Sequence, residues 1–182
     1  YLAEAPLLAL WSYRRRPQLT TQLAWAFLVV NVLGVITYLV FPAAPPWYVE
    51  KYGLGPAILN AAPDPAGAAR FGAITGIHYL DAFYARSPNV FGAMPSLHVA
   101  YPTFVAATVA GLGRRWWLPA GAFALLVAFS AVYLGHHYVL DVTAGAVYGV
   151  GALALVRVGL RALARRHAAS SAPGPEAVGP AE

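Results

Sequence analysis

Two short polar clusters carry the side chains best suited to chemistry. Residues 93–98 read AMPSLH and residues 135–141 read GHHYVLD. Within the second cluster His137 and Asp141 are four positions apart, so they would share one face of a helix. A carboxylate that accepts from one ring nitrogen fixes the imidazole tautomer and makes the other nitrogen a better nucleophile or base. His98, His137 and Asp141 are therefore our candidate catalytic residues.

The first cluster also carries the signals of a helix start. Pro95 suits the first turn of a helix, and Ser96 lies close to the cap position. A helix N-terminus presents unpaired N–H groups and the positive end of the helix dipole, which favours a phosphate group. We therefore expect Ser96 to contribute to phosphate binding beside His98.

A metal site is the competing interpretation of the same residues. His98, His136, His137 and Asp141 are all types that could ligate zinc. Adjacent histidines point in different directions on a helix, however, which disfavours their convergence on one ion. The chain contains no cysteine, so thiolate ligands and disulfides are excluded. We favour acid–base and nucleophilic chemistry over a metal centre.

The composition places these clusters in a membrane protein. Of the 182 residues, 59% are hydrophobic and only 10% are charged, whereas a soluble domain carries about 25% charged residues. Segments of roughly 20 apolar residues can span a bilayer, and they must be helical because lipid satisfies no backbone hydrogen bonds. We predict an all-α, polytopic transmembrane helix bundle with a partial span at residues 2–11 and four clear spans: Leu19–Phe41, Ser96–Leu112, Trp116–Leu134 and Tyr138–Val156.

The basic residues indicate the orientation of these spans. If the spans alternate in direction, nine arginines fall on one side and three basic residues, Lys51, Arg70 and Arg86, on the other. The nine are Arg14, Arg15, Arg16, Arg114, Arg115, Arg157, Arg161, Arg165 and Arg166. Because cytoplasmic loops carry the excess of Lys and Arg, the nine should be cytoplasmic and the two histidine clusters non-cytoplasmic. The net charge of +5 is thus a topology signal, and we expect no nucleic-acid partner.

The remaining segments divide into a long outer loop and a tail. Residues 42–95 hold eight of the fifteen prolines, which argues against a continuous helix, and so long a loop tends to be functional. Within it, the aromatic-rich stretch Phe71–Arg86 could form one short helix at the membrane interface. Residues 168–182 are mostly small residues, Pro and Gly, and we expect a disordered tail after a membrane-embedded domain of residues 1–167.

At these residues the chain resembles the type 2 phosphatidic acid phosphatase superfamily, which includes the vanadium haloperoxidases. The second family motif, PSGH, corresponds to Pro95-Ser96-Leu97-His98. The third, SRxxxxxHxxxD, corresponds to residues 130–141, with His137 and Asp141 in register. The resemblance implies that His137 forms a phosphohistidine, that Asp141 orients it and that His98 protonates the leaving oxygen of a lipid phosphate. It implies no metal or organic cofactor, and it leaves the oligomeric state open.

The departures from the family pattern concern positive charge. Ala131 stands where the third motif has arginine, and the first motif, KxxxxxxRP, has no match. A phosphoryl transition state still needs cations around its oxygens. We expect an outer cation to replace the arginine and favour Arg86, whose planar fork suits phosphate, over Lys51 and Arg70. His136 and His78 are possible helpers.

Three stretches resemble the subgroup that includes fungal inositol phosphorylceramide synthase. They are FPAAPPWY at residues 41–48, MPSLH at 94–98 and HHY at 136–138. This resemblance implies transfer of a phospho-alcohol headgroup, such as phosphoinositol, among membrane lipids. A polar alcohol as acceptor would make the protein a transferase, and water would make it a phosphatase. The alternative is a non-catalytic transporter or assembly subunit. An enzyme requires His98 and His137 to meet across one small polar cavity beside a cation.

Overall fold

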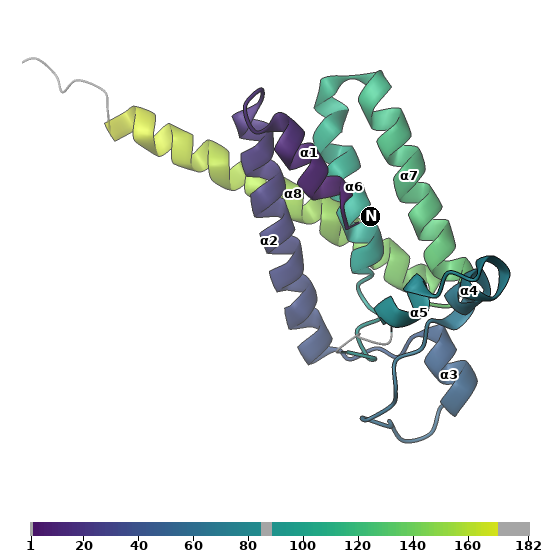
Figure 1. The fold of residues 1–182 in the computed structure, drawn as a ribbon. Helices are drawn as coiled ribbons and strands as arrows, with labels where there is room; N and C mark the ends of the chain where they lie inside the picture. The colour runs from purple at the N-terminus through teal and green to yellow at the C-terminus, as the bar shows by residue number, and fades with distance from the viewer. Residues whose placement is uncertain (1, 85–88, 171–182) are drawn as a thin grey trace, which may run out of the picture.

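The computed structural model describes residues 2–84 and 89–170 of the chain, and these residues form helices and their connections (Figure 1). The α-helices are α1 (Glu4–Ser12), α2 (Pro17–Val40), α3 (Pro46–Tyr52), α4 (Ala69–Thr75), α5 (Tyr79–Tyr84), α6 (Leu97–Val109), α7 (Arg114–Tyr133) and α8 (Val139–Ser170). Short 3₁₀ turns, Ala66–Ala68 and Ala110–Leu112, precede α4 and follow α6. Within the described ranges the only β-type pairing is a single bridge between Ala43 and Gly92.

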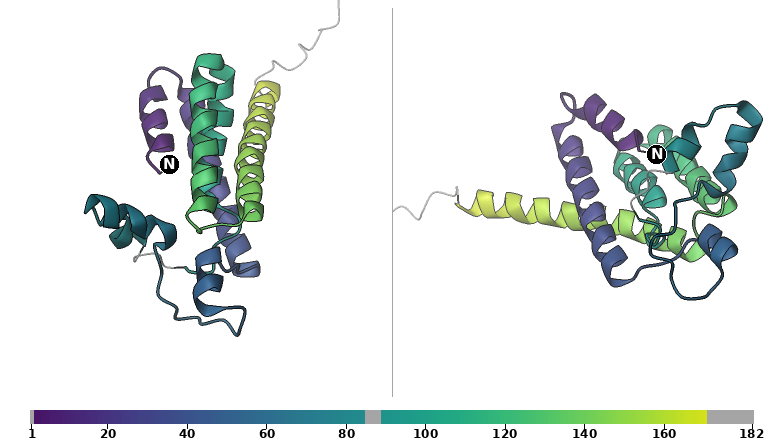
Figure 2. Two further views of the ribbon diagram at one scale, coloured as in Figure 1. Left: turned by 90° about the vertical axis from the view of Figure 1, so that its right-hand side faces the viewer. Right: turned by 60° about the horizontal axis from the view of Figure 1, so that its bottom comes forward.

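Three of the long helices are apolar enough to cross a membrane. Helices α2, α7 and α8 have mean hydropathies of 2.2, 1.6 and 1.8 over their most apolar stretches. The fourth predicted span corresponds to α6 and its 3₁₀ turn, Leu97–Leu112, which is apolar but shorter. These four helices pack together as a bundle, in which α8 crosses α2 at an angle, as the right-hand view of Figure 2 shows. The protein is therefore an all-α integral membrane protein, and α1, at nine residues, is too short to span on its own.

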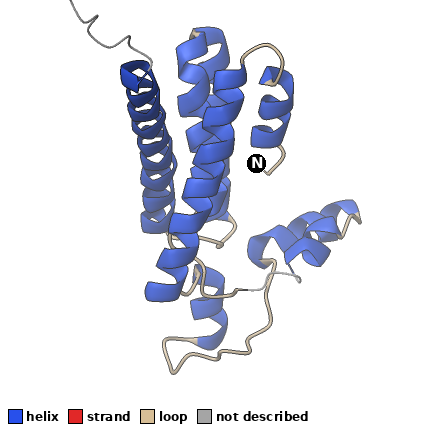
Figure 3. Cartoon of the chain, turned by 90° about the vertical axis from the view of Figure 1, so that its left-hand side faces the viewer, coloured by secondary structure: helices blue, strands red, loops and turns tan. Residues whose placement is uncertain are grey.

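The segment that follows α2 gathers at one end of the bundle, where Figure 3 shows its helices and long loops. It contains α3, α4 and α5, so the prediction of one helix over Phe71–Arg86 is wrong. Gly76 lies between α4 and α5 with a φ of 72°. That left-handed conformation, which glycine adopts at no steric cost, ends α4.

Main-chain hydrogen bonds fasten this segment to the bundle. Within the segment, the Ala43 N–H donates to the Phe91 carbonyl at 2.8 Å and joins its two ends. The Trp47 N–H donates to the Gly135 carbonyl, in the turn between α7 and α8, at 3.1 Å. The Gly67 N–H donates to the Leu134 carbonyl at 2.9 Å. A Cβ at Gly67 would lie only 3.0 Å from that carbonyl oxygen, so the close approach favours glycine. The outer segment thus covers the turn between α7 and α8.

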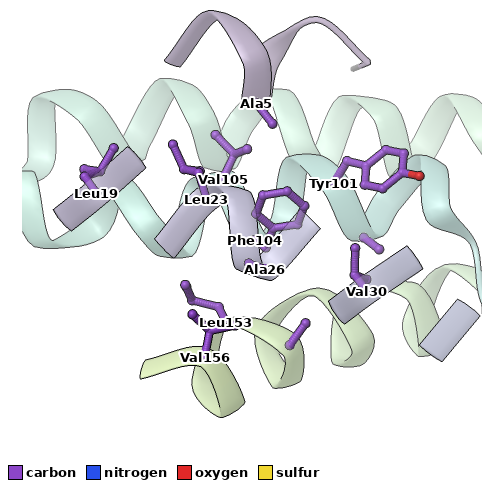
Figure 4. Packing of buried hydrophobic residues seen from close by; sticks show 12 residues of the cluster. Ala5, Leu19, Leu23, Ala26, Val30, Tyr101, Phe104, Val105, Leu153 and Val156 are labelled. Atoms are coloured by element: carbon purple, nitrogen blue, oxygen red, sulfur yellow. The ribbon is translucent and has the colours of Figure 1, made fainter. Parts of the chain in front are cut away.

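The buried core lies where α6 meets α2 and α8 (Figure 4). Phe104 of α6 is fully buried, with Val30 of α2 and Leu153 of α8 in the same cluster. Many apolar side chains instead point outward, including Leu39 and Leu125, which are 79% and 74% exposed. In a bilayer such side chains meet lipid tails, so their exposure agrees with a membrane setting.

Helices α6 and α8 approach so closely that only glycine fits between them. Gly145 and Gly149 lie one turn apart on α8, and each faces the backbone of α6. A Cβ at Gly145 would overlap the Ser96 carbonyl oxygen, and a Cβ at Gly149 would lie 2.5 Å from the Ala100 carbonyl oxygen. This small-residue spacing is the GxxxG pattern of packed membrane helices. It brings the first turns of α6 and α8 together.

Helix α8 is longer than the predicted span and ends at Ser170. It therefore includes residues 168–170, which the sequence assigned to a disordered tail. The rest of that tail, residues 171–182, lies outside the described residues.

Candidate active site

The two polar clusters meet at the end of the bundle that the outer segment covers. His98 lies in the first turn of α6, and Asp141 lies in the first turn of α8. His136 and His137 lie in the connection between α7 and α8. The close packing of α6 on α8 places these side chains within reach of one another.

His98 and His137 form a direct hydrogen bond. The Nδ1 atom of His98 lies 2.9 Å from Nε2 of His137. The other ring nitrogen of His137, Nδ1, lies 2.8 Å from the carbonyl oxygen of Ala93. Because a carbonyl only accepts, the network assigns the His137 proton to Nδ1. Nε2 of His137 then carries a lone pair, and His98 donates to it from Nδ1.

Asp141 lies beside His137 without a hydrogen bond to its ring. Its Oδ2 atom is 3.8 Å from His137 Nδ1 and accepts the Tyr138 N–H at 2.7 Å. The spacing argument predicted a shared helical face, but α8 begins at Val139, so His137 precedes the helix. Asp141 is 4% exposed and places a buried carboxyl group next to the imidazole.

Ser96 occupies the predicted N-cap position of α6 but does not line the histidine pocket. Its main-chain N–H donates to the Asp141 carbonyl at 2.9 Å. Its buried hydroxyl has no hydrogen-bond partner among the described residues. Ser96 therefore joins α6 to α8 through its backbone, and its contribution to phosphate binding stays a prediction.

A pocket of about 110 Å³ opens between the histidines and the outer segment. His98, His136 and His137 line it together with aromatic and polar residues of that segment: Pro45, Trp47, Pro63, Asp64, Tyr84, Asn89, Val90, Gly92 and Ala93. A phosphoryl group would fit in it, since the pocket volume equals only a few water volumes of about 30 Å³.

His136 lies between two rings in this pocket. Its ring stacks on Tyr84 with centroids 4.4 Å apart, and it lies nearly parallel to His98 at 6.4 Å. Its Nε2 atom is buried without a hydrogen-bond partner among the described residues. Burial, reinforced by the nearby His137, lowers the pKa of His136 to about 4. The ring is thus neutral at pH 7 and retains unused hydrogen-bonding capacity.

The basic residues expected near the phosphate lie elsewhere or outside the described residues. Lys51 Nζ contacts Asp64 Oδ2 at 2.8 Å. This ion pair raises the pKa of Lys51 and lowers that of Asp64. Arg70 and Lys51 both line a larger hollow beside the histidine pocket. His78 lines neither the histidine pocket nor this hollow. Arg86 lies outside the described residues, and none of the described lysines or arginines lines the histidine pocket.

The neighbouring hollow has a volume of about 470 Å³ and shares Trp47 and Asp64 with the histidine pocket. Charged side chains of both signs line it, namely Glu50, Lys51, Asp64 and Arg70. The site therefore consists of a small compartment at the histidines and a larger polar one beside it. Within residues 2–84 and 89–170, no three His, Cys, Asp or Glu side chains are arranged to hold a metal ion.

Comparison with known sequences defines the class of protein. The chain matches the PAP2 superfamily over residues 2–155, and it therefore belongs to that superfamily, as the sequence motifs predicted. It is 40% identical over 136 residues to a phosphoinositol dihydroceramide synthase of Bacteroides thetaiotaomicron, covering 73% of this chain and 44% of that protein. It is 35% identical over 123 residues to the inositol phosphorylceramide synthase catalytic subunit of Schizosaccharomyces pombe, covering 66% and 29%.

A third relative is inositolphosphotransferase 1 of Saccharomyces cerevisiae, which is 36% identical over 101 residues, 53% of this chain and 19% of that one. The chain thus spans less than half the length of these relatives. No solved structure matches the chain.

Sequence reasoning missed two parts of the site. The Ala93 carbonyl that bonds His137 has no signal in the sequence, because any residue carries a carbonyl. The close contact at Gly145 and Gly149 did have a signal in the sequence, since two glycines four residues apart within an apolar span are typical of helix–helix contacts.

Proposed function

We propose that this chain is the membrane-embedded catalytic part of a lipid phosphotransferase that moves a phospho-alcohol headgroup, such as phosphoinositol, through a phosphohistidine at His137. The observation that carries the proposal is the pair of contacts that His137 makes beside a small pocket: Nε2 lies 2.9 Å from His98 Nδ1, and Nδ1 lies 2.8 Å from the Ala93 carbonyl oxygen. The names of the relatives support the class of reaction, since one is a phosphoinositol dihydroceramide synthase and another an inositol phosphorylceramide synthase catalytic subunit.

In the first step the donor phosphodiester enters between His98 and His137 and replaces their mutual hydrogen bond. The lone pair of His137 Nε2 attacks phosphorus while the bond to the lipid alkoxide breaks. His98, protonated on both ring nitrogens beside the phosphate anion, gives one proton to the leaving oxygen. The products are a neutral lipid alcohol, a neutral His98 and a phosphohistidine that carries the headgroup.

In the second step the acceptor hydroxyl takes the place of the departed alcohol. His98 removes its proton, the oxygen attacks phosphorus, and the bond to His137 Nε2 breaks. The cycle ends with His98 again protonated and His137 again neutral. An acceptor lipid alcohol gives the transfer product, and water gives hydrolysis.

Buried groups around His137 stabilise the charge that these steps create. When Nε2 bonds to phosphorus the ring becomes cationic, and Asp141 at 3.8 Å and the Ala93 carbonyl at 2.8 Å both favour that form. His136 supports the phosphoryl oxygens, because its buried Nε2 has no hydrogen-bond partner among the described residues. The role of the missing motif arginine then falls to His136 and to a cation of the outer segment, for which Arg86 and Lys51 remain our candidates.

The two compartments suggest where the phosphoryl group and the alcohol headgroup of the donor lipid bind. A volume of about 110 Å³ suits the phosphoryl group alone, whereas a ligand pocket holds about 300–1,000 Å³. The adjoining 470 Å³ hollow falls in that range, and its carboxylates and cations can bond to the hydroxyls of a polyol. We assign the phosphoryl group to the first compartment and the alcohol headgroup to the second, with both on the non-cytoplasmic side.

A non-catalytic role for the histidines would require only that they hold helices together. It gives no reason for a pocket at the histidine pair or for an unpartnered His136 nitrogen within it. The catalytic proposal accounts for both features.

The test is to trap the intermediate in the protein reconstituted in vesicles. Phosphatidylinositol labelled with ³²P should transfer label to the protein, in a linkage that survives alkali and is lost in acid, as a phosphoramidate does. His137→Ala should abolish the labelling, whereas His167→Ala, at the far end of α8, should leave it intact. Addition of EDTA should not reduce it. Undiminished labelling of His137→Ala would overturn the proposal.

A chase separates the two outcomes of the second step. Labelled protein is mixed with ceramide or kept in buffer alone, and the products are separated by thin-layer chromatography. We expect a labelled phospholipid with ceramide, whereas release of labelled inositol phosphate at the same rate in both samples would identify a phosphatase.

A further inference from the structure

A second polar hollow lies at the opposite end of the bundle, between the start of α2 and the later turns of α8, where Figure 1 shows α8 passing α2. Its volume is about 530 Å³, within the range of ligand pockets. We call it the α2–α8 hollow. Two helix faces line it: Pro17, Gln18, Thr21 and Gln22 from α2, and Arg157, Leu160, Arg161 and Ala164 from α8.

The hollow contains one arginine that the protein holds in place. Arg157 donates from Nε to Gln22 Oε1 at 3.1 Å and from Nη2 to the Ala107 carbonyl at 3.3 Å. These bonds join α8 to α2 and α6 and fix the plane of the guanidinium. A guanidinium carries five N–H groups, so donors remain beyond the two that these bonds use.

The positive charge of the arginines in the hollow is not neutralised by any acidic residue lining it in the part of the chain that the structure describes. Arg161 follows Arg157 by one turn, is exposed, and lines the same face of α8. None of the described residues that line the hollow is Asp or Glu. The Thr21 hydroxyl already donates to the Pro17 carbonyl at 3.0 Å. Two cations and the side-chain amide of Gln18 therefore face a space without an anion, which is the chemistry of an oxyanion site.

The depth of the hollow in the membrane indicates where that anion comes from. Arg157 lies 18 positions after Val139, the first residue of α8, which is about 27 Å along a helix. The hydrocarbon core of a bilayer is about 30 Å thick. With the start of α8 at one membrane surface, Arg157 and Arg161 reach the headgroup level of the other, where phospholipid phosphates are the abundant anions.

We propose that the α2–α8 hollow is a binding site for an anionic phospholipid, whose phosphodiester is bound by Arg157 and Arg161. The site is distinct from the histidine pocket and lies at the other end of the bundle, so its lipid is not the substrate. A bound headgroup would contact α2 and α8 together. It would stabilise the arrangement of α2, α6 and α8 that also positions His98.

The test measures lipid retention by native mass spectrometry on the full chain in detergent. Phosphatidylglycerol and phosphatidylcholine with identical acyl chains are the two probes. We expect retention of phosphatidylglycerol over phosphatidylcholine, and we expect Arg161→Gln to weaken it by roughly fivefold to tenfold, the usual worth of one basic residue near a charged lipid surface. Arg165→Gln removes the same charge from the same helix outside the hollow and is the matched control.

A second measurement covers the case in which Arg161→Gln alters folding. The thermal midpoint of the native chain should rise with phosphatidylglycerol and not with an equal concentration of inorganic phosphate. Equal retention of both lipids, equal losses in Arg161→Gln and Arg165→Gln, or equal protection by inorganic phosphate would each overturn the proposal. Transfer activity is not needed for either readout.

Discussion

In the proposed mechanism Asp141 would act on His137 through space, because the Ala93 carbonyl takes the hydrogen bond that the carboxylate was expected to accept. A charge at 3.8 Å in a buried site still stabilises a cationic ring strongly. The residue also closes the first turn of α8 by accepting the Tyr138 N–H. The two roles can be separated by a substitution that removes the charge and keeps the acceptor.

Asp141→Asn should therefore lower turnover while preserving the fold. We expect kcat to fall by roughly 10- to 100-fold, equivalent to about 1.4–2.8 kcal/mol of lost stabilisation, with little change in the thermal midpoint because the amide oxygen can still accept from Tyr138. Steady-state transfer assays and thermal unfolding of the purified variant would measure both. Wild-type turnover in Asp141→Asn would remove the carboxylate from the mechanism.

His136 should make the protein sensitive to mild acid. Its pKa in the folded protein is about 4, whereas an unfolded histidine has a pKa of about 6.5. Between these values the unfolded chain binds a proton that the folded chain does not, so stability present above pH 6.5 is lost as the pH falls towards 4. His136→Gln should reduce the loss between pH 6.5 and 4.5 by about 1–3 kcal/mol.

Thermal midpoints of the two proteins across this range would test the prediction. His167→Gln, at the exposed end of α8, provides the control for loss of a histidine as such. Identical pH profiles for the wild type and His136→Gln would contradict it.

At the scale of single residues, the sequence predicted the participants better than their contacts. Residue type and motif spacing indicated His98 and His137, and the structure brings them to 2.9 Å. The prediction of a hydrogen bond between Asp141 and the His137 ring was wrong. Residues four positions apart share a face only inside a helix, and α8 begins two residues after His137. The cation prediction stays open, since Arg86 lies outside the described residues.

At the scale of helices, the contact between α6 and α8 sets the distance between the two halves of the site. Gly145→Ala would place a methyl group against the Ser96 carbonyl, and the backbones would have to separate. His98, two residues after Ser96, and Asp141, one turn before Gly145, would separate with them. We expect a lower thermal midpoint and a loss of transfer activity of at least about tenfold, because small misplacements of reacting groups are costly.

Gly151→Ala is the matched control for this change. Gly151 lies in the same helix, and a Cβ there meets nothing within 4 Å. Alanine should stabilise α8 there by up to about 1 kcal/mol through helix propensity. Equal behaviour of the two variants in activity and unfolding would show that the close contact does not control the site.

The long helices could be predicted from the sequence, and the short ones could not. Runs of apolar residues located α2, α6, α7 and α8, because a bilayer demands length and low polarity. Helices α3, α4 and α5 contain only six or seven residues each and carry no such signal. Contacts with the turn between α7 and α8 hold this segment, and those contacts are long-range.

At the scale of the whole molecule, the arginines predict which end of the bundle faces the cytoplasm. The chain has no cysteine, so single cysteines can report each end separately. Leu59→Cys, in the outer segment, and Gly111→Cys, in the 3₁₀ turn before α7, occupy exposed positions with room for a label. In intact cells an impermeant maleimide should label the first and not the second.

Permeabilised cells supply the control, since both positions should then react. Labelling of both cysteines in intact cells, or of Gly111→Cys alone, would contradict the orientation. Labelling of Gly111→Cys alone would place the histidines on the cytoplasmic side, and the proposed access of substrate from the non-cytoplasmic leaflet would fail.

The hydrogen bond from His137 to the Ala93 carbonyl does not depend on which amino acid occupies position 93. Any amino acid at position 93 supplies the same carbonyl, so the bond can persist while the residue drifts, limited only by the tight space around a side chain that is 3% exposed. No amino-acid substitution at position 93 removes the carbonyl group, and alanine scanning cannot test it because the residue is already alanine. Only a change to the main chain itself, such as an ester in place of the amide that follows Ala93, would weaken the acceptor and release the His137 tautomer.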